Sequence, residues 1–364
     1  KKIYLISLGG NMIDFTNNFA KKYKLNPMAL DVVISLIPGV IFAFLAYGIF
    51  PVLVIIVSIL SALITEFLFS LFFLNKKGTT RDLTAVISAM LLAFLLPPFT
   101  PLYTIAFGAS MAMIFGKLAF GGMGKNRFNP AVIGRDFTTL FLISTLATPT
   151  TLIQNHSPKY LHIFNGSLEF IDRFIWDPVG NIGNYSPLFL LLGGIYLIYK
   201  KRISFYTPLC FLAVLLFGVK ILALFQIYLP YSFSGATLIA AFYILTDPMT
   251  TSNTKNGKIF QGIIFGLSIL MFLILGLKYG VFKYKYFTFG ILSLNFFVPY
   301  INKITKNKEN IVLKLIGLGI GILIVDFIFA KIIILGYFSY IMYIYILYAI
   351  FKFCQLKRAV ANKS

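Results

Sequence analysis

The chain has 364 residues, of which 59% are hydrophobic and only 12% are charged. Soluble globular proteins carry about 25% charged residues, so this composition excludes a soluble enzyme. The net charge of +21 would favour nucleic-acid binding in a soluble protein, but most Lys and Arg residues stand between long apolar runs. Those runs are long enough to cross a lipid bilayer, so the sequence predicts an all-α polytopic membrane protein and no nucleic-acid partner.

Twelve apolar runs are expected to form membrane-embedded helices. They cover residues 30–49, 51–74, 83–97, 101–118, 129–147, 187–199, 205–225, 233–250, 259–277, 286–300, 311–335 and 337–353. Several are shorter than the ~20 residues that a straight crossing needs. The shortest are therefore expected to be broken or partial spans.

The distribution of basic residues predicts an orientation. If residues 1–29 form a cytoplasmic arm, alternating the runs places 24 Lys and Arg residues inside, among them Lys117 and Arg135, and five outside. Cytoplasmic segments of membrane proteins carry such an excess. The longest polar stretch, 148–186, is then an external loop.

Two of the runs share an internal spacing. Ala85 precedes Pro97 by 12 residues, and Ala236 precedes Pro248 by the same distance. In the alternating topology the first run starts inside and the second outside, which is typical of inverted repeats with broken helices. We expect a first five-helix repeat over 30–147, a second over 187–300, and an extension over 301–364 with two further spans.

A glycine-rich loop joins the fourth and fifth runs. It reads Phe120-Gly-Gly-Met-Gly-Lys-Asn-Arg-Phe-Asn-Pro-Ala131. Gly121 and Gly122 permit positive φ, and Asn126 and Asn129 supply donors and acceptors. From spacing alone, a tight turn that satisfies its own backbone is favoured over a ligand-binding loop.

A cluster of small residues opens the eighth run. Ser234, Gly235, Ala236 and Thr237 stand at its outer mouth, and Thr246-Asp247-Pro248 ends it. The unpaired N–H groups of a helix start suit a phosphate, and a threonine hydroxyl there could carry a phosphate ester. The alternative, which the physics alone favours, is a helix cap with small-residue packing.

Together the two motifs resemble the RnfD/NqrB family of membrane redox subunits, over about residues 25–305. The resemblance implies FMN bound through a phosphoester to Thr237, installed by a flavin transferase, and a non-covalent riboflavin within the bundle. The cofactor-binding residues that it implies are Ser234, Gly235, Ala236, Thr237, Asp247, Gly121, Gly122, Asn126 and Asn129. Family members usually carry a glutamate where Asn184 stands, so any role of that acid is in doubt.

The resemblance is strongest to RnfD and implies membership of a bacterial inner-membrane complex. Such a subunit relays electrons between ferredoxin- and NAD-linked partner subunits, coupled to Na⁺ or H⁺ export. This chain has two cysteines and no Rossmann fingerprint, so iron–sulfur centres and NAD⁺ are expected in partners. Three alternatives stay open: an NqrB-like quinone-reducing subunit, a redox-free transporter, or a scaffold that has lost its flavin.

Three acids are candidates for an ion pathway. Asp82 and Asp247 abut the ends of the two short runs and could instead cap helices. Asp326 lies in an apolar run of the extension, where an ionisable group is costly and is a functional candidate by default. The alternative for Asp326 is an ion pair with Lys331, or a lysine that snorkels away.

Overall fold

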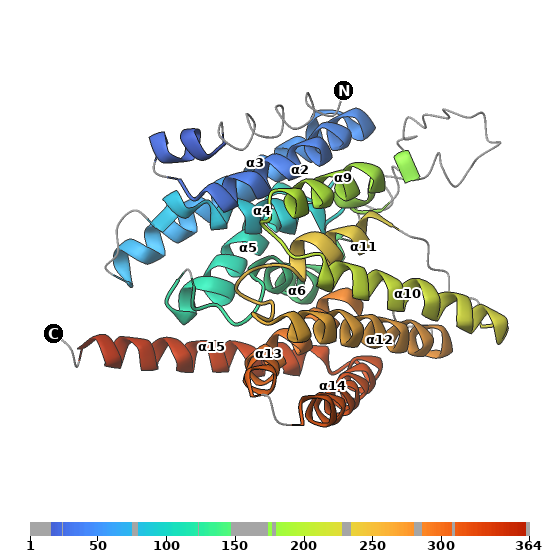
Figure 1. The fold of residues 1–364 in the computed structure, drawn as a ribbon. Coiled ribbons are helices and arrows are strands. Elements are labelled where there is room, and N and C mark those ends of the chain that lie inside the picture. The colour runs from blue at the N-terminus through green and yellow to red at the C-terminus, as the bar shows by residue number, and fades with distance from the viewer. Residues whose placement is uncertain are drawn as a thin grey trace.

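The computed structural model describes residues 16–23, 25–74, 79–122, 124–146, 174–176, 180–227, 234–279, 286–307 and 310–361. Within these ranges all regular elements are helical, and seven helices are long and apolar enough to cross a membrane (Figure 1). Three shorter apolar helices accompany them. The prediction of an all-α polytopic membrane protein is confirmed.

Each of the twelve predicted runs corresponds to a helix. In chain order these are α2 (Pro27–Tyr47), α3 (Ile49–Phe72), α4 (Thr84–Phe94), α5 (Leu102–Met111), α6 (Pro130–Phe141), α9 (Pro187–Tyr199), α10 (Tyr206–Leu224), α11 (Gly235–Ile239), α12 (Lys255–Tyr279), α13 (Tyr286–Lys306), α14 (Ile311–Ile334) and α15 (Phe338–Ala361). Two continue as single wide turns of π-helix, α5 into η2 (Ala112–Lys117) and α11 into η5 (Ala240–Ile244). Short 3₁₀ turns are η1 (Thr79–Asp82), η3 (Leu118–Phe120) and η4 (Ile182–Asn184).

Local sequence explains where two helices begin. Asn26 accepts a hydrogen bond from the Met28 amide, and Pro27 occupies the first turn of α2. Asn129 and Pro130 repeat this arrangement at the start of α6, where Asn129 accepts from the Ala131 amide. An Asn side chain satisfies an orphan N–H, and a Pro lacks the N–H that would otherwise be orphaned.

The two predicted repeats pack against each other through corresponding helices. The first helices of the two sets, α2 and α9, are in contact, and so are the last, α6 and α13. Within the sets, α3 packs on α4 and α5, and α10 packs on α12. In Figure 1, α2 and α3 lie at one edge of the bundle and α14 lies at the opposite edge.

The short helices α4 and α11 run in opposite directions. A Cβ on Gly183 of η4 would collide with both Phe94, at the end of α4, and Ile239, at the end of α11's first segment. Only a glycine lets the chain pass between the two. At the other end, Thr84 at the start of α4 and Thr246 after η5 line one cavity. This arrangement agrees with the inverted orientation that the spacing of 12 residues predicts.

The helices after residue 310 pack on the rest of the bundle. Helix α14 lies against α12 and α13, and α15 lies against η3 and α6. The Tyr345 hydroxyl of α15 donates to the Phe115 carbonyl in the π-helical turn, at 2.7 Å. The extension is thus anchored to the first repeat as well as to the second.

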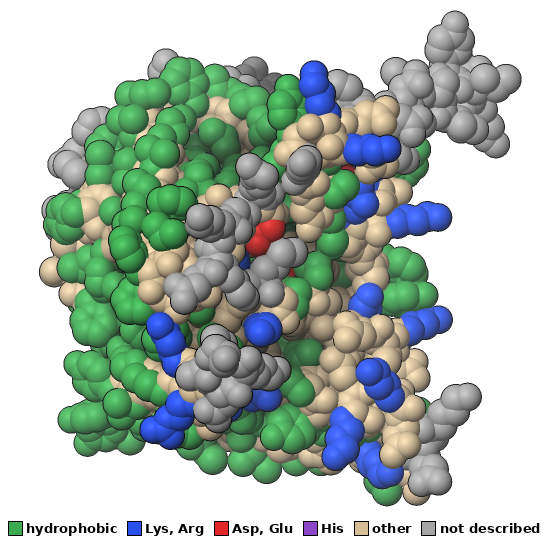
Figure 2. All heavy atoms as spheres, turned by 90° about the vertical axis from the view of Figure 1, so that its left-hand side faces the viewer, with side chains coloured by type: hydrophobic (Ala, Val, Ile, Leu, Met, Phe, Trp, Pro, Cys, Tyr) green, Lys and Arg blue, Asp and Glu red, His purple; other side chains and the backbone are tan. Residues whose placement is uncertain are grey.

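Figure 2 shows Lys and Arg side chains along the right-hand side and in the lower part of the face that it draws, next to a mainly hydrophobic left-hand side. The Lys and Arg residues at helix ends or in loops include Lys125, Arg127, Lys201, Arg202, Lys255, Lys258, Lys303 and Lys306. Among the described residues, three members of the predicted inside set are not surface residues of this kind. Lys200 is buried and lies 3.8 Å from Asp31. Lys117 is buried in the π-helical turn, and Arg135 lies within α6, where its Nε donates to the Leu95 carbonyl at the end of α4.

Most of the predicted external loop, including residues 151–173, and the first 15 residues of the predicted arm lie outside the described residues. Residues 16–23 of the arm are helical.

Candidate functional site

Thr237 stands in the first turn of α11 and its side chain is fully buried. Its hydroxyl oxygen lies 3.4 Å from that of Ser234. Gly235 packs directly on the backbone of Gly183 and Asn184, so that a Cβ there would collide with both. Gly235 therefore serves close packing of α11 on η4, as the alternative of small-residue packing predicts, whereas the Ser234 side chain makes no cap hydrogen bond.

Asn184 helps to cover the start of α11. Its side-chain oxygen is buried and accepts no hydrogen bond from any described residue. Such an orphaned acceptor is uncommon in a native fold and marks a place where a donor from outside the described chain would fit.

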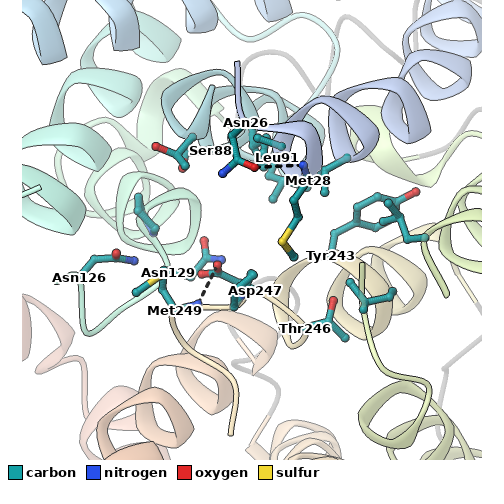
Figure 3. Close-up of a pocket in the computed structure, with 18 of the residues that line it drawn as sticks. Asn26, Met28, Ser88, Leu91, Asn126, Asn129, Tyr243, Thr246, Asp247 and Met249 are labelled. Carbon is teal, nitrogen blue, oxygen red and sulfur yellow. Dashed lines mark hydrogen bonds between the residues drawn. The ribbon is translucent and has the colours of Figure 1, made fainter. Parts of the chain in front are cut away.

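A cavity of about 170 Å³ lies at the other end of the short helices (Figure 3). It is enclosed by α2, α4, the glycine-rich loop and the residues that follow η5. Its lining is mainly apolar, and its polar members are Asn26, Thr84, Ser88, Lys117, Asn126, Asn129, Tyr243, Thr246 and Asp247. Figure 3 shows Asn26 and Ser88 on one side of the opening, facing Asn126, Asn129 and Asp247 on the other.

The predicted cofactor residues therefore separate into two places. Ser234 to Thr237 lie at the start of α11, whereas Asp247, Asn126 and Asn129 line the cavity beyond its end. Gly121 and Gly122 have positive φ, 105° and 93°, as predicted for a tight turn, but they do not line the cavity.

Asp247 lies outside the helices, in the turn that follows η5. It accepts hydrogen bonds from the Met249 amide at 3.3 Å and the Thr250 hydroxyl at 3.1 Å. Lost hydration raises the pKa of the Asp247 carboxyl, and these two donors oppose that shift. The residue thus holds a turn together while its carboxyl faces the cavity, and in these contacts it caps no helix.

A buried ion network borders the same cavity. Lys117 Nζ lies 2.7 Å from Glu66 Oε1 and 3.4 Å from Asp82 Oδ2, and it also donates to the Thr84 hydroxyl. Asp82 caps α4 as well, because its Oδ1 accepts from the Thr84 amide at 2.8 Å. One ammonium group therefore faces two carboxylates in the low-dielectric interior, which is stable only while the cation is present.

Sequence reasoning missed Glu66 and the role of Lys117 in this network. The available signal was an acid inside the apolar run 51–74, which is costly without a partner. Asp31 gave the same signal in the first run. It is buried on α2 and pairs with Arg202 at 2.6 Å and Lys200 at 3.8 Å, both at the end of α9.

The pairing of Asp326 with Lys331 is wrong as a prediction. Asp326 accepts a hydrogen bond from the Ser268 hydroxyl of α12. Lys331 instead donates to the Tyr279 hydroxyl at 2.8 Å on the surface of the bundle, as the snorkelling alternative predicts. Among the described residues no group of three or more His, Cys, Asp or Glu side chains is placed to hold a metal ion.

The fold and this site define a polytopic membrane protein with two oppositely directed broken helices around an internal cavity. A family model described as the NQR2, RnfD, RnfE family matches residues 16–310. The chain belongs to this family.

Curated relatives support the same assignment. One, from Clostridium ljungdahlii, is 32% identical over 301 residues, which cover 76% of this chain and 88% of the relative. Its name makes it one subunit of a proton-translocating ferredoxin:NAD(+) oxidoreductase complex. A second, from Acetobacterium woodii, is 30% identical over 79% of this chain and 91% of its own length, and is named as the Na(+)-translocating counterpart. A third, from Escherichia coli, is named as one subunit of an ion-translocating oxidoreductase complex. It is 28% identical over 77% of this chain and 92% of its own length.

Proposed function

We propose that this chain is the RnfD-type membrane subunit of an ion-translocating ferredoxin:NAD⁺ oxidoreductase complex. In this proposal it carries FMN on Thr237, relays electrons between ferredoxin- and NAD-linked partner subunits, and couples the relay to export of Na⁺ or H⁺. The relatives with these names match most of their own length, which favours a whole subunit over a shared fragment.

The observation that carries the cofactor proposal is the place of Thr237. It stands beside a second hydroxyl in the first turn of a helix broken within the bundle. The other end of this helix opens on the cavity that Asp247 and Asn129 line. A group fixed at Thr237 would therefore sit at one end of a short helix whose far end leads to a second candidate site.

The residues fit a phosphoester in chemical type, because a threonine hydroxyl is a competent acceptor and its neighbours are small. Their burial limits when a flavin transferase could reach the Thr237 hydroxyl. Thr237 is fully covered, and Gly235 is packed on the backbone of Gly183 and Asn184. We infer that the flavin transferase acts before η4 closes over α11, or on a form in which the two have separated. The bound flavin would supply one- or two-electron transfer, while the protein holds it in position and excludes water.

The cavity is the candidate site for the second, non-covalent flavin. Its mainly apolar wall suits an aromatic ring system, and Asn126 and Asn129 supply amide groups to orient one. Asn129 already caps α6 with its side-chain oxygen, so its amide N–H₂ is the group available to a ligand.

The choice between Na⁺ and H⁺ does not follow from similarity. The relatives from C. ljungdahlii and A. woodii have nearly equal identity to this chain, yet one is named proton-translocating and the other Na⁺-translocating. The ion carried by this chain must therefore be decided from its own side chains.

The test is in-gel flavin fluorescence of the denatured chain after co-expression with a flavin transferase. We expect a fluorescent band in the wild type that is lost in Thr237→Ala, because the ester oxygen is gone. Thr246→Ala is the matched control, since Thr246 is another buried threonine near the same broken helix and its hydroxyl donates to the Phe242 carbonyl. It should keep the fluorescence.

Ser234→Ala tests which of the two neighbouring hydroxyls carries the flavin, and it should also keep the fluorescent band. Loss of fluorescence in Ser234→Ala but not in Thr237→Ala would move the attachment to Ser234. A wild-type band without fluorescence would contradict covalent flavin and favour a redox-free transporter on the same scaffold. Reduction of an added quinone by the purified complex would favour the NqrB-like alternative.

A further inference from the structure

A buried acid, Asp326, lies beyond the family match, which ends at residue 310. Asp326 is on α14, one of the seven helices long and apolar enough to cross a membrane, and it is only 1% exposed. Helix α14 packs on α12 and α13, so the carboxyl faces a junction of three helices.

Two hydroxyl groups meet the carboxyl at this junction. Ser268 of α12 donates to Asp326 Oδ2 at 2.5 Å, and Ser293 of α13 lies against the same carboxyl. The other carboxyl oxygen, Oδ1, and the Ser293 oxygen are both buried and have no hydrogen-bond partner in the described part of the chain. Because these two atoms belong to neighbouring groups, a single proton shared between them would satisfy both.

Apart from Asp326 itself, the charged groups on the three helices are all lysines. They are Lys255, Lys258 and Lys278 on α12, Lys303 and Lys306 on α13, and Lys314 and Lys331 on α14. Among the described residues, none of these lysines forms an ion pair with Asp326. The nearest of them along α14, Lys331, donates to Tyr279 and lies 4.4 Å from the centre of that ring. An ionised Asp326 would therefore be an uncompensated charge inside the membrane.

The number of oxygen atoms favours a proton over a metal ion. Asp326, Ser268 and Ser293 offer four side-chain oxygens, whereas hard metal cations in proteins take roughly six or more oxygen ligands. A proton needs only one acceptor, and it converts the costly buried carboxylate into a neutral acid. With the proton on Oδ1, the acid could donate to the unpaired Ser293 oxygen.

We propose that Asp326, held by Ser268 and Ser293, is a proton-binding site within the membrane. Binding forms one O–H bond on the carboxylate and neutralises it, and release breaks that bond and returns the proton to water. The site does not depend on a flavin at Thr237, so either proposal can fail without the other. It would add a protonatable group to the complex from a part of the chain that the family match does not cover.

The test is labelling with dicyclohexylcarbodiimide, an apolar reagent that modifies protonated carboxyls inside membranes. Membranes containing the full-length chain in its complex are treated across a pH series, and the peptide carrying Asp326 is examined by mass spectrometry. We expect an N-acylurea adduct on Asp326 that decreases as the pH rises, and no adduct in Asp326→Asn.

Two variants sharpen the result. Glu66→Gln should leave the Asp326 adduct unchanged, because Glu66 belongs to the separate network of Lys117. Ser268→Ala should extend labelling to more alkaline pH, because the lost donor stabilised the charged carboxylate.

The wild-type measurement can overturn the proposal without any variant. Absence of an Asp326 adduct at every pH would show that the carboxyl is not available as the neutral acid. Protection by NaCl, but not by KCl, at constant pH would instead make the site a sodium site.

Discussion

Two membrane-embedded acids, Glu66 and Asp326, are equally buried but differ in what faces them. Each is 1% exposed on a long apolar helix. Glu66 is 2.7 Å from the ammonium group of Lys117, whereas Asp326 has two neutral serine hydroxyls beside it and no ion pair among the described residues. The first is balanced by a cation from another helix, and the second can be balanced by a proton. Burial alone does not assign a role to an acid, because the partner decides which form is stable.

The largest expected effect comes from removing the cation of the Glu66 network. Lys117→Met leaves Glu66 and Asp82 as buried carboxylates without their ammonium partner, which should cost about 3–5 kcal/mol of unfolding free energy. Thermal unfolding of the purified full-length chain in detergent measures this loss. Adding Glu66→Gln to Lys117→Met should recover part of it, because one uncompensated charge is then gone. A Lys117→Met protein as stable as the wild type would contradict the claim that Lys117 balances the charge of Glu66.

A smaller effect is expected at the second acid. In Asp326→Asn a neutral amide replaces a neutral acid, and its oxygen can still accept from Ser268, so stability should fall by less than about 1 kcal/mol. The same unfolding assay at neutral pH measures this change. A loss as large as that of Lys117→Met would mean that Asp326 is an ionised structural group, and the contrast with Glu66 would disappear.

The smallest effect is expected at Lys331, which the sequence analysis considered as an ion-pair partner of Asp326. Its ammonium group contacts the Tyr279 hydroxyl at the surface and not the acid, so Lys331→Met should leave the melting temperature unchanged within error. It should also leave the carbodiimide labelling of Asp326 unchanged. A shift of the labelling curve in Lys331→Met would reveal an electrostatic contact between the two that the described geometry does not contain.

The cavity that lies beside α4 and the end of η5 extends the comparison to the broken helices. Helix α4 starts beside the paired acid Asp82, and η5 ends beside Asp247, which has two neutral donors. The two oppositely directed helices thus bring one paired and one unpaired acid to related positions near the same cavity. A group that gains or loses charge in this cavity would act on Asp247 more strongly than on Asp82.

Most of the fold could be predicted because its signals are local. Each of the twelve apolar runs corresponds to a helix, Asn-Pro pairs mark the starts of α2 and α6, and glycines in the loop after Phe120 have positive φ. The motif at Ser234 to Thr237 and the family resemblance also came from short stretches of sequence. A membrane makes helices easier to predict from sequence, because the backbone polar groups of a spanning segment must form hydrogen bonds within the helix.

The sequence by itself determined that this is a polytopic membrane protein, where its helices lie and to which family it belongs. Only the tertiary structure decided that Lys117 reaches Glu66, that Asp326 faces Ser268 rather than Lys331, and that Gly235 packs on η4 beside the buried Thr237. These contacts join residues far apart in the chain, and no local period encodes them. The physical reason is that the cost of a buried charge depends on atoms a few ångströms away in space, which only packing brings together.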